Sequence, residues 1–321
     1  MPLPPPAEWA PHAAVWIGFP SHAELWAADL APARAEVAAF AAAVHADGRG
    51  EQVLLVAADD EAAAAAARLA PFAELVVEPF GDIWLRDTGP IIRGDGRAAD
   101  FDFNGWGGKY DLAGDDTIGR RLARRRRLPT AFCSWVLEGG AIDGDGTGLA
   151  VTTAQCLLNP NRNPAMSQAD IERRLADELG LDRIVWLGEG LIHDHTDGHV
   201  DNLARFVAPG RVAIPRPAEN DPNWRVYQLA AEDARRGGLE VVEVPSPGRV
   251  LRDEEIVPAS YMNFYIGNAA VVVPTYGAPN DAAAVAAIGG LFPGREAIGL
   301  RADRILTGGG SLHCISQQIP A

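Results

Sequence analysis

Five polar segments recur along the chain, and each places a charged or reactive side chain beside glycine or a tight turn. The residues that carry chemistry in them follow at intervals of about 50 to 65 positions, and they are Asp87, Glu138, His199, Asn263 and Cys314. Such a period, with strands and a helix in each repeat, is typical of a closed ring of similar units. Equivalent turns of a ring meet near its axis, so we expect one shared site. The alternative is that loosely similar glycine turns recur by chance.

Cys314 has the surroundings of a nucleophile, because it follows His313 and a run of glycines. Glycine lets backbone N–H groups approach a thiolate, and a nearby histidine can lower the thiol pKa. A catalytic cysteine also needs a histidine and a carboxylate from elsewhere in the sequence. His199 and Asp201 lie two positions apart and would face the same side of a strand. Glu138, followed by two glycines, could orient the imidazole from an adjacent turn.

Two aspartates indicate what such a nucleophile would attack. Asp87 and Asp201 are acids that an ester or amide hydrolase would not need beside its cysteine, whereas a planar guanidinium is bound best by carboxylates. Trp84 could cover the apolar stem of such a ligand or stack on the cation. We assign Asn263 to the same substrate-binding set. These residues favour a cysteine hydrolase for a cationic amidine or guanidine.

A metal site is the rival interpretation. His193, His195 and His199 stand close together with several aspartates, which is a plausible ligand set for Zn²⁺ or Mn²⁺. A metal-dependent amidohydrolase or ureohydrolase would use it to activate water. The remaining histidines show no second ligand cluster. The residues alone leave both interpretations open and favour the cysteine.

Charge narrows the choice of partner. The 321 residues include 43 acidic and 28 basic side chains, for a formal net charge of −15. This argues against nucleic acid or an anionic membrane and is compatible with a cationic small molecule, although acidity can also serve solubility alone. The exception is a basic run at residues 120–127, for which a solvated helix face is favoured over a binding arm.

Three cysteines make no disulfide framework, so a reducing compartment is the default. Cys133 and Cys156 lack catalytic surroundings and are expected in the core. The first residues do not resemble a signal peptide, and no apolar run approaches the roughly 18 residues that span a bilayer. We therefore expect a cytoplasmic protein.

Helices and strands are predicted to alternate along the whole length. Helices are expected at residues 32–44, 61–69, 167–179, 224–236 and 281–288. Strands are expected at residues 52–57, 75–77, 212–214, 241–244 and 269–273. No Ser- or Gly-rich linker interrupts them, so an α/β fold with a single catalytic domain over residues 1–321 is predicted.

Long motifs in a fixed order then resemble the agmatine deiminase family, also described as bacterial peptidyl-arginine-deiminase-type, within the guanidino-modifying (pentein) superfamily. The resemblance covers nearly the whole chain. It is carried by residues 8–16, 82–90, 103–110, 137–140, 152–164, 196–202, 260–266 and 308–318.

The resemblance implies a five-bladed α/β propeller, the pentein fold, with pseudo-fivefold symmetry. It also implies hydrolysis of a guanidine to a ureido product and ammonia without metal or other cofactor. In agmatine deiminases the product is N-carbamoylputrescine, on the route to putrescine. Cys314 would form a covalent amidino-cysteine intermediate, and His199 would act as acid and base.

The other roles follow from the same resemblance. Asp87 and Asp201 would hold the guanidinium nitrogens, Glu138 would support the histidine, and Trp84 would line the substrate stem. The partner is thus a small cationic guanidino compound, and homo-oligomers are known in the superfamily.

The chain departs from the family pattern at two places. Ser21 and His22 stand where a basic residue is usual, and His195 replaces an acidic residue of the substrate-side wall. The reaction type is unaffected, but the substrate could instead be arginine, peptidyl-arginine or a methylated guanidine. An amidinotransferase or a non-catalytic guanidine-binding protein is also compatible with these residues.

Overall fold

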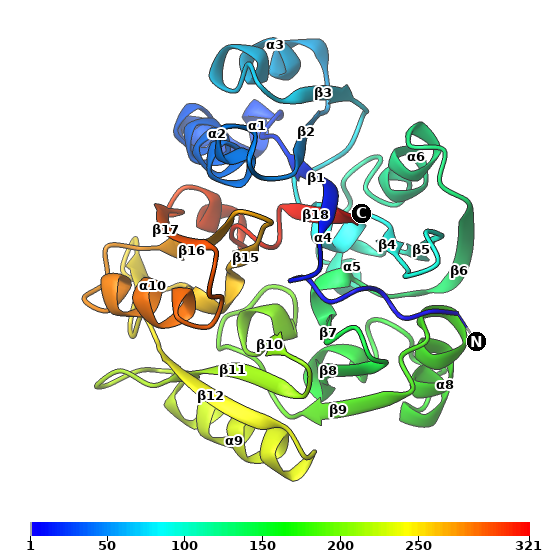
Figure 1. Ribbon diagram of the computed structural model, residues 1–321, viewed down its shortest axis with the longest axis vertical. Coiled ribbons are helices and arrows are strands. Elements are labelled where there is room, and N and C mark those ends of the chain that lie inside the picture. Colours follow the sequence, from blue (N-terminus) through cyan, green and yellow to red (C-terminus); the bar gives the residue numbers. More distant parts are fainter. Residues whose placement is uncertain (1) are drawn as a thin grey trace.

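The computed structural model describes residues 2–321 and contains five β-sheets that share one strand pattern (Figure 1). In each sheet the first strand is antiparallel to the second, and the second is parallel to the third. The strands, in that order, are β18 (Ser316–Pro320), β1 (His12–Gly18) and β2 (Gln52–Ala57); β4 (Ile91–Ile92), β5 (Ala98–Asp102) and β6 (Thr130–Val136); β7 (Ile142–Gly144), β8 (Leu149–Thr153) and β9 (Arg183–Leu187); β10 (Arg205–Ala208), β11 (Arg211–Arg216) and β12 (Glu240–Pro245); and β15 (Tyr265–Ile266), β16 (Ala270–Thr275) and β17 (Glu296–Arg301).

Helices connect the second strand of each sheet to the third, as a parallel pair requires. The longer helices lie at the outside of the molecule, around the sheets (Figure 1). In chain order they are α2 (Leu30–His45), α6 (Ile118–Arg125), α8 (Gln168–Leu179), α9 (Trp224–Arg236) and α10 (Asp281–Gly289), with the short α1 (Ala23–Trp26), α5 (Gly105–Gly108) and α7 (Ala154–Leu157) in the same connections. The first sheet has a further strand, β3 (Glu74–Val77), reached through α3 (Asp60–Leu69), and a separate hairpin consists of β13 (Leu251–Arg252) and β14 (Glu255–Ile256).

Local sequence explains where the helices begin and end. Ser167 and Asp170 form a reciprocal capping box at the start of α8, and Gly180 ends that helix in the left-handed conformation. The Asp59 carboxylate accepts the Ala62 N–H at the start of α3. These caps fix the starts of α3 and α8 and the end of α8.

The two ends of the described chain meet in one sheet. β18 pairs antiparallel with β1, so that His12 lies opposite Pro320. The largest hydrophobic cluster spans the same region and includes Trp16, Phe40 and Tyr265, all of which are fully buried. The first sheet is therefore completed by strands from both ends of the described chain.

The predicted α/β class is confirmed, and the predicted helices and strands are found within a few residues of their expected bounds. The expectation that His199 and Asp201 share a strand is wrong. They lie at the start of a single 3-10 turn, η4 (Val200–Asn202), because Gly198 has φ +85° and the Thr196 hydroxyl accepts the His199 N–H.

The basic run lies mostly on α6, where its side chains pair with acids of the chain itself. Arg120 pairs with Asp100, and both Arg121 and Arg125 pair with Glu78. Within residues 2–321, no helix has both the length and the apolar character needed to cross a membrane.

Candidate active site

Each of the five polar segments lies in a helical or irregular turn directly before the first strand of a sheet. The residues and turns are Asp87 in α4 (Leu85–Thr88), Glu138 before η3 (Gly139–Ala141), His199 before η4, Asn263 in η5 (Tyr261–Asn263), and Cys314 after η6 (Ile305–Gly308). Because the sheets surround a common centre, these turns meet there. All of them, and Asp201, are buried.

The thiol of Cys314 is held by two of the predicted residues. Asn263 Nδ2 lies 3.0 Å from Sγ, and the thiol donates to Asp201 Oδ2 at 3.4 Å. The amide oxygen of Asn263 accepts the backbone N–H groups of His313 and Cys314, at 2.9 and 3.2 Å. Burial raises the pKa of Cys314 well above its usual value, and the carboxylates of Asp201 and Asp87 raise it further. A cation placed among these groups would therefore favour the thiolate.

Asp87 connects this thiol region with the histidine. Its carboxylate accepts the Gly140 N–H and the Trp106 indole N–H, both at 2.9 Å. His199 Nδ1 lies 3.6 Å from Asp87 Oδ1. Burial alone would lower the pKa of His199, but chiefly the Asp87 carboxylate raises it well above its ordinary value. The imidazolium is thus the favoured form, ready to donate a proton.

Glycine is needed at position 140 for this approach. A Cβ there would lie 2.6 Å from His199 Nδ1 and 2.7 Å from Asp87 Oδ1. No side chain can be accommodated at those distances without moving the catalytic groups.

Glu138 does not hydrogen-bond the imidazole, but its negative charge contributes to the raised pKa of His199. Its Oε1 accepts from Arg162 Nε at 2.6 Å, while Oε2 has no partner. Both ring nitrogens of His199 also lack hydrogen-bond partners. Arg162 in turn donates to Asp197 Oδ2 and to the Thr196 carbonyl, at 2.5 and 2.8 Å. Arg162 thus ties Glu138 to the turn that precedes His199.

A buried network behind Asp201 was missed by sequence reasoning. Asp201 Oδ2 lies 2.8 Å from His313 Nδ1, and the other nitrogen of that ring lies 2.9 Å from Glu8 Oε2. Arg205 donates to the same oxygen of Glu8 at 2.8 Å. Burial opposes ionisation of Asp201, yet the interaction with His313 lowers its pKa, so it stays a carboxylate. Its Oδ1 is buried and has no hydrogen-bond partner.

A pocket opens above these groups and encloses about 320 Å³ of empty space, its mouth included. Its lining residues are Trp84, Asp87, Trp106, Tyr110, His195, Thr196, Gly308, Gly309, Gly310 and Cys314. The predicted position of Trp84 in the pocket wall agrees with this lining, and its indole N–H donates to Asp82 at 2.8 Å. A Cβ at Gly308 or Gly310 would come within 2.5 or 2.6 Å of the Trp84 ring. This volume suits a small ligand.

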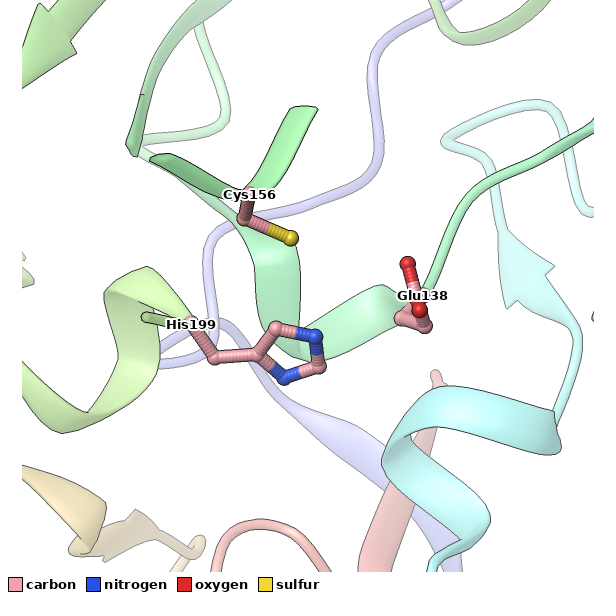
Figure 2. Close-up of side chains that lie close together, drawn as sticks. All are labelled: Glu138, Cys156 and His199. Atoms are coloured by element: carbon pink, nitrogen blue, oxygen red, sulfur yellow. The ribbon is translucent and has the colours of Figure 1, made fainter. Parts of the chain in front are cut away.

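His195 lies at this pocket and not in a metal cluster. Its Nδ1 lies 3.1 Å from the Tyr110 hydroxyl, and its carbonyl accepts from Lys109 at 2.7 Å. In residues 2–321, the group of metal-type donors that comes together is instead Glu138, Cys156 and His199, with donor atoms within 4.8 Å of one another (Figure 2). The ligand set of His193, His195 and His199 is therefore not assembled. Cys156 is in the core as expected, but sequence reasoning did not place it beside His199.

Comparisons with known proteins agree on one family. The sequence profile of the Porphyromonas-type peptidyl-arginine deiminases matches residues 5–320. The agmatine deiminase of Stutzerimonas stutzeri is 39% identical, over 98% of this chain and 95% of that protein. The solved agmatine deiminase of Enterococcus faecalis superposes with a TM-score of 0.90 at 30% identity, over 98% and 95% of the two chains. A cysteine-to-serine agmatine deiminase of C. jejuni, solved with substrate bound, superposes with a TM-score of 0.90 at 29% identity, over 99% and 96%.

Proposed function

Because this chain belongs to the Porphyromonas-type peptidyl-arginine deiminase family, we propose that it is a hydrolase that deiminates a guanidino compound. Agmatine is the leading substrate, with N-carbamoylputrescine and ammonia as products, as the names of the relatives suggest. One observation carries the proposal. The Cys314 thiol contacts the Asp201 carboxylate, and Cys314 and Asp87 both line the pocket.

In the proposed reaction, Asp87 and the free oxygen of Asp201 bind guanidinium nitrogens. The Cys314 thiolate attacks the central carbon and forms a C–S bond. His199 gives its proton to the departing nitrogen as the C–N bond breaks and ammonia leaves. The neutral imidazole then takes a proton from water, whose oxygen attacks the amidino carbon. The C–S bond then breaks and restores the thiolate, and the hydroxyl left on the carbon loses its proton to solvent, which gives the ureido product.

We also propose that the chain is one catalytic domain with the five-bladed pentein architecture. Support comes from the shared strand pattern of the five sheets and from the joining of β18 to β1. Glu138, held by Arg162, would act on His199 through its negative charge, and Asn263 would position the thiol. Catalysis without a metal or cofactor remains part of the proposal.

The first test is a panel of guanidines, with agmatine, arginine, peptidyl-arginine and methylguanidines assayed for ureido product and ammonia. We expect turnover of agmatine above the others. No ureido product from any member would contradict hydrolysis, and amidino transfer to an added amine would instead indicate an amidinotransferase.

The outer pocket makes a prediction about the tail of agmatine. Asp87 is the only carboxylate among the lining residues named above, and it lies beside the catalytic groups. His195→Glu places a second carboxylate at the tail, so kcat/KM for agmatine should rise about tenfold, as one charged hydrogen bond contributes. The matched control is His195→Gln, which adds no charge. Equal values for Glu and Gln would show that position 195 does not contact the tail.

The proposed clamp makes a second prediction. Asp87→Asn or Asp201→Asn keeps the shape but removes the charge, and should lower kcat/KM by on the order of 100-fold, since hydrogen bonds between charged groups contribute about 1.5–3 kcal/mol each. Asp100→Asn is the control, because Asp100 is buried but pairs with Arg120 on α6. Activity within about threefold of wild type in both clamp variants would refute the clamp.

A further inference from the structure

Three side chains from separate segments face a common space beside the catalytic histidine. Cys156 lies on α7, Glu138 lies between β6 and η3, and His199 immediately precedes η4. Figure 2 shows the thiol, the carboxylate and the imidazole directed toward one another. We propose that these three residues form a binding site for Zn²⁺ and that the ion inhibits the enzyme.

The donor atoms in this group are fully buried and largely unpaired. Glu138, Cys156 and His199 each have 0% of their surface exposed. Neither ring nitrogen of His199 has a hydrogen-bond partner, and Glu138 Oε2 has none. Buried polar atoms without partners are unfavourable, so a cation that binds Glu138 Oε2 and one nitrogen of the deprotonated imidazole gains affinity.

Arg162 fixes the Glu138 carboxylate in a position where it can bind a metal ion. Its Nε donates to Glu138 Oε1 at 2.6 Å, which leaves Oε2 on the free side. Ligands fixed by such surrounding hydrogen bonds bind metals more tightly. The Asp87 carboxylate, 3.6 Å from His199, adds negative charge that offsets the arginine.

The ligand types match zinc. Thiolate, imidazole and carboxylate are its usual protein ligands, and three of them leave a fourth position for water. Bonds of about 2.0–2.3 Å hold tetrahedral ligand atoms roughly 3.5 Å apart, whereas these donors lie within 4.8 Å of one another. Small side-chain rotations would bring them together. On binding, the Cys156 thiol and the His199 imidazolium each release a proton to solvent as the S–Zn and N–Zn bonds form.

Inhibition would follow from the residues that the ion takes. Zn²⁺ would occupy the lone pairs of His199 and Glu138 but would leave Asp87, Trp84 and Cys314 in the pocket. The metal should therefore lower kcat more than it changes KM. This consequence rests on the proposed function, whereas the binding site itself does not.

Binding is tested with Cd²⁺, a zinc substitute whose bond to thiolate absorbs in the ultraviolet. The full chain should show this band with one equivalent of Cd²⁺, as should Cys133→Ser and Cys314→Ser. Cys156→Ser and Cys156→Ala should lose the band and bind Zn²⁺ at least about tenfold more weakly by calorimetry. Absence of the band in the wild type, or its loss in Cys314→Ser, would overturn the proposal.

The double variant Cys133→Ser/Cys314→Ser keeps Cys156 as its only cysteine, so it tests the site even if the Cys156 variants fail to fold. It should retain the Cd²⁺ band, and a lost band in the folded double variant would contradict the site.

Inhibition is tested by activity measurements. Wild-type enzyme treated with EDTA should keep full turnover, and added Zn²⁺ should inhibit it by lowering kcat. Turnover that requires a metal, or equal inhibition of Cys156→Ser, would refute an inhibitory ion. Turnover of no guanidine at all would refute the proposed function while leaving the Cd²⁺ result intact.

Discussion

Replacing Cys314 with serine should lower kcat by roughly 10⁴-fold or more, because a serine hydroxyl is far less acidic than a thiol and a far weaker nucleophile. Substrate binding should stay within about threefold of wild type, since Asp87 and Asp201 are untouched. Calorimetry with agmatine and a sensitive ammonia assay measure the two effects separately.

Cys133→Ser is the matched control, since Cys133 lies on β6 in a hydrophobic cluster. It should retain wild-type turnover. Near-normal turnover of Cys314→Ser would show that another residue is the nucleophile. Alkylation gives an independent measurement: the raised pKa of Cys314 predicts slow labelling of the free enzyme at neutral pH and faster labelling as the pH rises.

His199→Ala should reduce turnover by roughly 10²–10⁴-fold, the usual contribution of a general acid and base. The variant should also accumulate the amidino-cysteine intermediate, because water is no longer activated after the thiolate has attacked. Intact-protein mass spectrometry with substrate should show added mass, and digestion should place it on the peptide that contains Cys314.

The histidine prediction has a control next to the pocket. His195→Ala removes an imidazole that contacts Tyr110 and does not contact Asp87, so it should accumulate no adduct. An adduct on Cys133 or Cys156, or wild-type turnover of His199→Ala, would contradict the assignment.

The sequence predicted the elements well where hydrophobic pattern and capping residues act locally. The buried strand at residues 52–57 and the helix at residues 224–236 were predicted with the bounds that the structure has. The period of the polar segments also predicted that Asp87, Glu138, His199, Asn263 and Cys314 would meet, because equivalent turns of similar units occupy equivalent places.

The partners of those residues could not be predicted in the same way. Glu8 lies shortly before β1 and His313 shortly before β18, so the pairing of these strands brings the two residues together, and no local pattern encodes that contact. The hydrogen-bond partner of Glu138 is Arg162 and not the imidazole, and the sequence did not indicate that pairing. The available signal for this pairing was Arg162, which lies inside the motif at residues 152–164. An arginine that is buried in the core needs a carboxylate partner.

The pairing of β18 with β1 has a consequence for how the protein folds. β1, an inner strand of the first sheet, receives its antiparallel partner from the far end of the described chain, with His12 opposite Pro320. Contacts between residues so distant in sequence form slowly, because a very long loop must close before they contribute. During synthesis one edge of β1 therefore stays open until β18 has emerged, and an open strand edge is prone to pair with other chains. Because Cys314 lies in the turn that leads into β18, the thiol gains its neighbours at the same late stage. Incompletely synthesised chains should consequently be both inactive and the most dependent on chaperones.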